Sequence, residues 1–112
     1  MRALVIAVLL MACGATPEDI AKNLESDNPV IREDTAKIAH NFDSPEVREA
    51  LLALLEDERE MVRYNAVESL VELEEVDAVP ALIEMVETEE SQKVLREVID
   101  ALGRLGQPEA VP

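Results

Sequence analysis

Few side chains in this sequence are placed to do covalent or metal chemistry. The chain has one histidine, His40, and one cysteine, Cys13. No serine, cysteine or carboxylate stands at a spacing from His40 that is typical of a catalytic triad. Glu72, Glu74 and Glu75 crowd the end of a predicted helix, but they lack the ligand spacing of an EF-hand loop. We therefore predict no enzyme, no metal site and no cofactor.

The cysteine follows an apolar N-terminal segment. Arg2 precedes an apolar run over residues 3–12. This run is too short to span a bilayer, which takes about 20 residues, but it has the length of the hydrophobic region of a signal peptide. The sequence LMACG at residues 10–14 resembles the lipobox of bacterial lipoproteins. That resemblance implies cleavage before Cys13 and acylation of its sulfur.

The lipobox resemblance also predicts how the start of the chain is organised. Residues 1–12 would be a lipoprotein signal peptide, and residues 13–16 would be the lipidated N-terminus with a short tether. Several acyl chains, at about 0.8 kcal/mol per buried methylene, would hold the chain on the membrane. By the same resemblance, Gly14 after the cysteine favours the outer membrane. The competing interpretation is an apolar N-terminal helix packed on the fold, with Cys13 as a buried hydrophobic residue.

Composition limits the fold and the partner. A chain of 112 residues makes one domain, and 48% hydrophobic content with 2% aromatic content predicts a core of aliphatic side chains. The net charge of -15 would repel the phosphates of a nucleic acid, so we expect no nucleic-acid partner. A basic protein segment fits better. The competing interpretation is that the acids only solvate the helix surfaces.

The middle of the chain has the pattern of two amphipathic helices. Leucines recur through residues 51–55, and a second apolar stripe follows at Val62, Ala66, Leu70 and Leu73. The four residues between the stripes, 57–60, are all charged. A single antiparallel helix pair cannot cover its own apolar surface, so we expect it to pack on similar pairs.

Such pairs recur with a period of about 31 residues. Residues 24–32 align with residues 55–63, and residues 81–86 align with residues 50–55; one extra residue then sets Val94 against Val62. A helix pair repeated at this period predicts a stacked α-solenoid. The repeat domain would span residues 17–112, with units at about 17–42, 45–74 and 78–106. Residues 108–112 would start a further unit, because AVP at 110–112 repeats AVP at 78–80; either the array continues or this stub folds back as a cap.

Two segments carry a family resemblance. The spacing of Val62, Arg63, Ala66 and Leu70, and the sequence ALGRLG at residues 101–106, are similar to the short bacterial HEAT repeat, including the class first described in phycobilin lyases. The resemblance implies an all-α solenoid of about three stacked antiparallel helix pairs in a right-handed superhelix.

The same resemblance gives two arginines a structural role. Arg32 and Arg63 occupy equivalent places in their second helices. In HEAT-like repeats such an arginine reaches toward an acid in a neighbouring turn and ties adjacent units together. Leu95 occupies the aligned place in the third unit, so the resemblance leaves that tie in doubt there.

The helical period locates a candidate binding surface. In stacked helix pairs the second helices line the concave side, and their solvent-facing residues recur at i, i+4 and i+8. This row comprises Glu33, Lys37 and Asn41, then Tyr64, Glu68 and Glu72, then Arg96, Asp100 and Arg104. An exposed tyrosine flanked by acids is typical of a hot spot for a basic segment. We therefore expect partner contacts at Lys37, Tyr64, Glu68, Glu72, Arg96 and Asp100, the competing interpretation being a solvated row without a partner.

Together these features predict a lipid-anchored, non-enzymatic HEAT-repeat scaffold or adaptor. It would face the periplasm from the bacterial envelope, attached to the membrane at Cys13, and its partner would be an unidentified envelope protein with a basic surface. The alternative is a soluble accessory protein or a bilin lyase-like protein. Loss of residues 1–12 with a gain of acyl mass would separate the two.

Overall fold

The computed structural model describes residues 14–106, and its regular elements in that range are all helices. This confirms the predicted all-α fold. In chain order the elements are α2 (Pro17–Leu24), α3 (Pro29–Ile38), η1 (Ala39–Asn41), α4 (Pro45–Ala53), η2 (Leu54–Glu56), α5 (Glu60–Glu72), η3 (Val76–Ala78), α6 (Val79–Thr88) and α7 (Gln92–Leu105).

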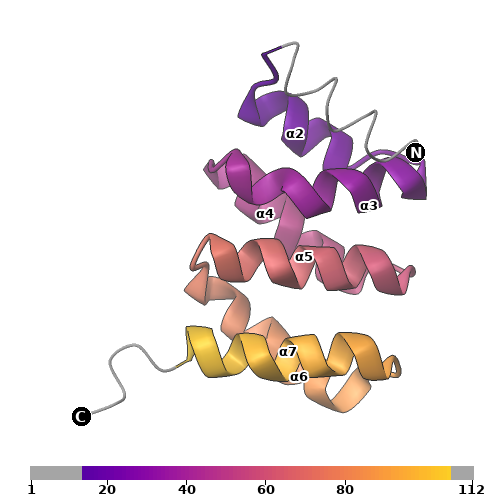
Figure 1. The fold of residues 1–112 in the computed structure, drawn as a ribbon, viewed down its shortest axis with the longest axis vertical. Coiled ribbons are helices and arrows are strands. Elements are labelled where there is room, and N and C mark those ends of the chain that lie inside the picture. The colour runs from indigo at the N-terminus through magenta and orange to yellow at the C-terminus, as the bar shows by residue number, and fades with distance from the viewer. Residues whose placement is uncertain (1–13, 107–112) are drawn as a thin grey trace.

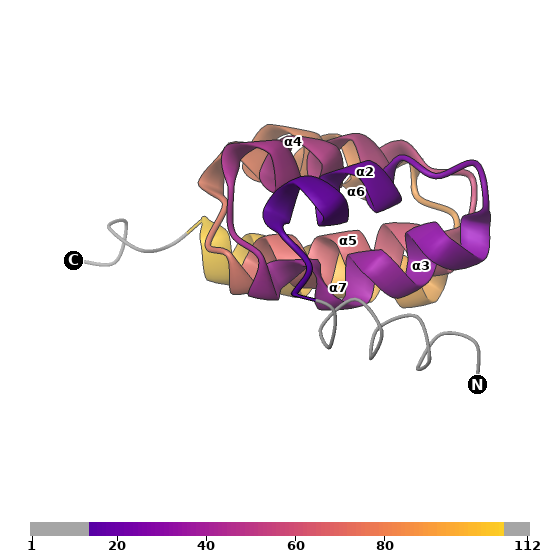
Figure 2. The same cartoon turned by 90° about the horizontal axis from the view of Figure 1, so that it is seen from above.

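The helices form three antiparallel pairs, α2 with α3, α4 with α5 and α6 with α7, stacked one on the next along the long axis of the molecule (Figure 1). Viewed along the stack, α2, α4 and α6 form one layer and α3, α5 and α7 form the other (Figure 2). Helix α5 packs between α3 and α7, and α2 packs on α4. The core between the layers is aliphatic, with fully buried residues such as Ile20, Leu51, Leu70, Leu82 and Val98.

Local sequence signals place the helix starts. Thr16 forms a capping box in which its hydroxyl accepts from the Asp19 N–H at 3.2 Å and the Asp19 carboxylate accepts from the Thr16 N–H at 3.0 Å. Ser44 caps α4. Ser91 caps α7, which begins at Gln92 and runs through Gly103 to Leu105.

Two details distinguish the first unit. Its second helix, α3, ends at Ile38 and is followed by a tighter 3-10 turn over Ala39–Asn41. Ile31 is only half-buried. Its aligned residue, Val62, is fully buried in α5, which has a second helix on each side, whereas α3 has one only on its α5 side within the described residues.

Candidate partner-binding groove

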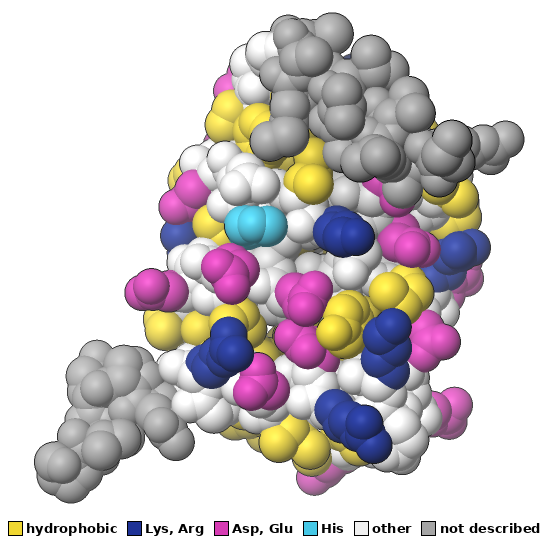
Figure 3. Space-filling view, viewed as in Figure 1, with side chains coloured by type: hydrophobic (Ala, Val, Ile, Leu, Met, Phe, Trp, Pro, Cys, Tyr) yellow, Lys and Arg dark blue, Asp and Glu magenta, His cyan; other side chains and the backbone are white. Residues whose placement is uncertain are grey.

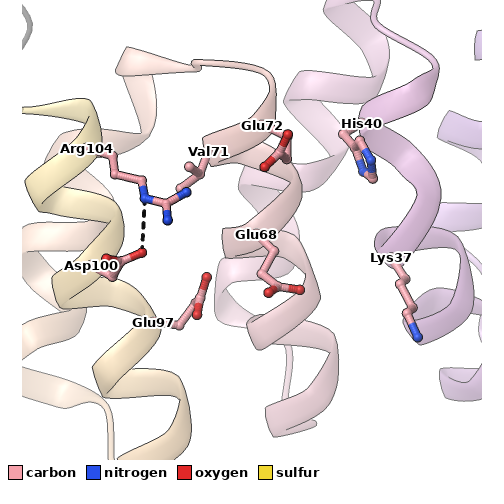
Figure 4. A pocket seen from close by; sticks show the side chains of 8 residues that line it. All are labelled: Lys37, His40, Glu68, Val71, Glu72, Glu97, Asp100 and Arg104. Carbon is pink, nitrogen blue, oxygen red and sulfur yellow. Dashed lines mark ion pairs between the residues drawn. The ribbon is translucent and has the colours of Figure 1, made fainter.

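A groove crosses the layer of second helices and receives side chains from all three units. It encloses about 360 Å³ and is lined by Lys37 of α3 and His40 of η1, by Glu68, Val71 and Glu72 of α5, and by Glu97, Asp100 and Arg104 of α7. Figure 4 shows these side chains converging from the three helices. We call this set the acidic groove, because four of its eight members are carboxylates. The same face carries clustered acidic side chains in the space-filling view (Figure 3).

Only part of this negative charge is paired inside the groove. The Nε of Arg104 lies 3.2 Å from Oδ2 of Asp100, and both side chains are more than half exposed. An exposed pair of this kind contributes little to stability. Burial, together with the nearby carboxylates of Glu68 and Asp100, raises the pKa of Glu97 above its usual value. The groove therefore carries a local excess of negative charge that a cationic side chain would relieve.

The structure brings together four of the six residues predicted to contact a partner. Lys37, Glu68, Glu72 and Asp100 all line the acidic groove. Arg96 is exposed on α7, but it is not among the lining residues.

Tyr64 differs most from the prediction. The sequence predicted an exposed tyrosine at the centre of the patch, but its ring is half-buried against the core and lies outside the groove lining. The Nζ of Lys93, on α7, stands 5.0 Å from the ring centroid, within the range of a cation–π contact. Burial, with the carboxylates of Glu97 and Glu68, raises the pKa of Tyr64. The prediction treated α5 as a free surface, whereas Tyr64 contacts its neighbour α7.

His40, Val71 and Glu97 were not predicted to line the groove. The prediction followed one row along each helix, whereas the groove also takes residues from the sides where helices meet. Shifting the chain by 32 residues aligns Glu97 with Asn65. Since the Asn65 side chain crosses to α3, this alignment could have placed Glu97 between α7 and α5.

Two arginines hold the turns of successive units together. The Nε of Arg32 donates to the Asp57 carboxylate at 2.7 Å, and its Nη1 donates to the Ser26 carbonyl at 2.8 Å. Arg63 repeats the arrangement one unit later, with Nε and Nη2 donating to the Glu89 carboxylate at 2.9 and 2.8 Å. Each arginine thus binds an acid in the turn of the next unit. This confirms the interpretation that they tie the units together.

A second set of contacts fixes α5 against α3. Nδ2 of Asn65 donates to the Glu33 carbonyl at 3.0 Å, and the buried hydroxyl of Ser69 donates to the Ala36 carbonyl. Buried hydrogen bonds of this kind are costly to break because they would leave polar groups unsatisfied. These two hydrogen bonds set the spacing between α3, which carries Lys37, and α5, which carries Glu68.

Two features are absent from the described part of the chain. Across residues 14–106, no cluster of three or more His, Cys, Asp or Glu side chains is arranged to hold a metal ion. In the same range no helix is both long enough and apolar enough to cross a membrane. Cys13, the predicted lipidation site, lies outside the described residues.

Comparison with known proteins defines the family. A family model described as HEAT repeats matches residues 17–94, well over half of the chain. The chain belongs to the HEAT-repeat family. HEAT repeats generally act as scaffolds for protein–protein interaction, and the match begins with α2 and extends into α7. A comparison with curated proteins gave no match.

Proposed function

We propose that this HEAT-repeat chain is a non-enzymatic adaptor that binds a basic segment of another envelope protein in its acidic groove. Acyl chains on Cys13 hold it on the periplasmic side of the bacterial envelope, with the outer membrane favoured. The observation that carries the proposal is the gathering of Glu68, Glu72, Glu97 and Asp100 in one groove built by three repeats.

The chemistry of the groove favours a cationic partner. A lysine or arginine side chain entering between Glu68 and Glu97 would face two carboxylates, and burial together with the nearby charge of Glu68 raises the pKa of Glu97. Val71 adds an apolar surface for the stem of such a side chain. The net charge of -15 attracts a basic segment over a longer range and speeds its association.

A charge-reversal pair tests the groove. Glu68→Lys combined with Glu72→Lys replaces two groove acids, while Glu46→Lys combined with Glu49→Lys makes the same change in charge on α4, in the other layer. Partners that copurify with the chain from solubilised membranes are compared by quantitative mass spectrometry. We expect the groove variant to lose a partner that the α4 variant and the parent chain keep.

Two results would contradict binding in the acidic groove. If the groove variant keeps the same partners as the parent, or if both variants lose them equally, the groove is not the binding site. A matching circular dichroism spectrum for the two variants excludes unfolding as the cause of a loss. Raised salt should weaken the specific interaction, because the attraction is between exposed charges.

The lipid anchor has a separate test. Intact-mass analysis of the chain extracted from membranes should show loss of residues 1–12 and an added acyl mass, and Cys13→Ala should abolish both. After this cleavage the chain would also lose Arg2 and become one unit more negative. An unprocessed, soluble chain would contradict the anchor and favour the soluble accessory or lyase-like alternative.

A further inference from the structure

The third unit presents an apolar surface at the end of the stack. Among residues 14–106, the large hydrophobic side chains that are exposed are Val76, Ile83, Val86 and Ile99, at 52%, 57%, 41% and 55%. Three of them belong to the third unit, and Val76 lies in η3 just before it; the helices of the third unit form the end of the stack opposite α2 (Figure 1). Hydrophobic surface is visible at this end in Figure 3.

The repeat alignment shows which way these side chains face. Ile99 aligns with Val67, which is fully buried in α5. Ile83 and Val86 align with Leu52 and Leu55, which line the crevice between α4 and α6. The third unit therefore presents outward the surface that the second unit uses to pack on its successor.

Two further differences between the third unit and the second make this surface suitable for close packing. Leu95 stands where Arg63 makes its tie in the second unit, so an apolar side chain replaces a charged one. Gly103 stands where Val71 does, and a Cβ on it would contact nothing within 4 Å. We define the end face as Val79, Ile83 and Val86 of α6 with Leu95, Ile99 and Leu102 of α7.

We propose that the end face is a homodimer interface, in which two copies of this chain pack end face against end face about a two-fold axis. An apolar surface needs an apolar complement, and within the described residues the exposed large hydrophobic side chains lie in the third unit and in η3 just before it. Among the described residues, the surface that matches the end face is therefore the same face of another copy. Pairing a patch with itself is the isologous geometry of two-fold dimers.

The area of the end of the stack limits the strength of the contact. The described part of the molecule measures 45 × 29 × 19 Å, and the stack runs along the longest axis. A full end-on contact over the remaining two dimensions would cover at most on the order of 1,100 Å² from both copies, close to the roughly 1,000 Å² needed for a specific interface. We expect a reversible dimer whose population depends on protein concentration.

The response to added salt distinguishes this contact from binding in the acidic groove. Two copies each carrying a charge of -15 repel one another, and added salt screens that repulsion without weakening apolar contacts. Dimerisation should therefore strengthen as salt is raised, whereas binding of a basic segment should weaken.

Sedimentation analysis of the full chain, in detergent where it is membrane-bound, tests the proposal. The parent chain should change from one copy to two as concentration rises. Ile99→Lys should remain a single copy throughout, while Ile99→Leu and Ala53→Lys, an equal charge change at an exposed position on α4, should dimerise like the parent. The groove variant Glu68→Lys with Glu72→Lys should also dimerise, so the two proposals can fail independently.

Cross-linking tests the symmetry. In the variant Ile99→Cys, a short bismaleimide should join two copies through position 99, with the parent chain as the control for Cys13. Head-to-tail stacking would place position 99 against the α2 end of the next copy and would give no product through this position. The absence of that product, a parent chain that stays a single copy at every concentration, or an Ile99→Lys variant that still dimerises would overturn the proposal.

Discussion

Arg63 and Glu89 form one of the two most enclosed ion pairs in the described residues, with side chains 18% and 3% exposed. Burial alone would raise the pKa of the Glu89 carboxyl, but hydrogen bonds from Arg63 and from the backbone N–H of Ser91 outweigh it and lower the pKa below its usual value. The pair therefore stabilises the fold while Glu89 is charged. This contribution is lost as the pH falls through the lowered pKa.

Removing the arginine leaves that carboxylate buried without its partner. Arg63→Ala should lower the free energy of unfolding by about 2 to 4 kcal/mol at pH 7. Arg104→Ala, which breaks an exposed pair, should cost no more than about 0.5 kcal/mol. Chemical denaturation of the three chains measures both, and similar losses for the two variants would show that the Arg63 tie is not structural.

Glu97 has the opposite pH dependence. Because its pKa is raised in the folded chain by burial and by Glu68 and Asp100, the charged form costs stability at neutral pH, and protonation relieves the cost. Glu97→Gln should raise the melting temperature by about 2 to 4 °C at pH 7. The gain should shrink toward zero below the ordinary glutamate pKa of 4.5, where this side chain is protonated in the folded and the unfolded chain. Thermal melts across pH check this, and a gain that does not change with pH would contradict it.

At the scale of the helix, the chain leaves α5 through a residue, Glu74, with an unusual backbone conformation. The N–H groups of Glu74 and Glu75 donate to the carbonyls of Val71 and Leu70 at 2.9 and 3.0 Å, which is the pattern of a Schellman motif. Glu74 adopts a φ of +55° in this motif, a left-handed conformation that favours glycine.

The same substitution two residues apart should therefore have opposite effects. Glu74→Gly should stabilise the chain by about 0.5 to 1 kcal/mol, because glycine adopts the left-handed conformation without strain. Glu72→Gly, at the last residue of α5, should destabilise it by a similar amount through lost helix propensity. Denaturant titration compares the two, and effects of the same sign would refute this interpretation of the helix end.

Sequence predicted the helices well because their signals are local. A capping side chain followed by proline, at Thr16 and Ser44, specifies a helix start within a few residues, and the apolar period specifies the buried face. The 3-10 turn at residues 39–41 and the half-buried ring of Tyr64 depend on how neighbouring helices pack. Glu97 was missed for the same reason: its place in the groove follows from contact between two helices rather than from the period of one.

At the scale of the whole molecule, the acidic groove exists because three units stack. Lys37 comes from the first unit, Glu68 from the second and Asp100 from the third, so no single helix pair carries the groove. The arginine ties and the buried bonds from Asn65 and Ser69 keep the second helices in register. The central claim is that this shared surface receives a basic partner.

Photo-cross-linking in cells tests this claim most directly. A photoreactive phenylalanine analogue replaces Val71 inside the groove or, as the matched control, Ala53 on α4. We predict that illumination links the chain to a distinct envelope protein from position 71 but not from position 53, and that adding Glu68→Lys abolishes the product. No product from position 71, or the same products from both positions, would contradict the account.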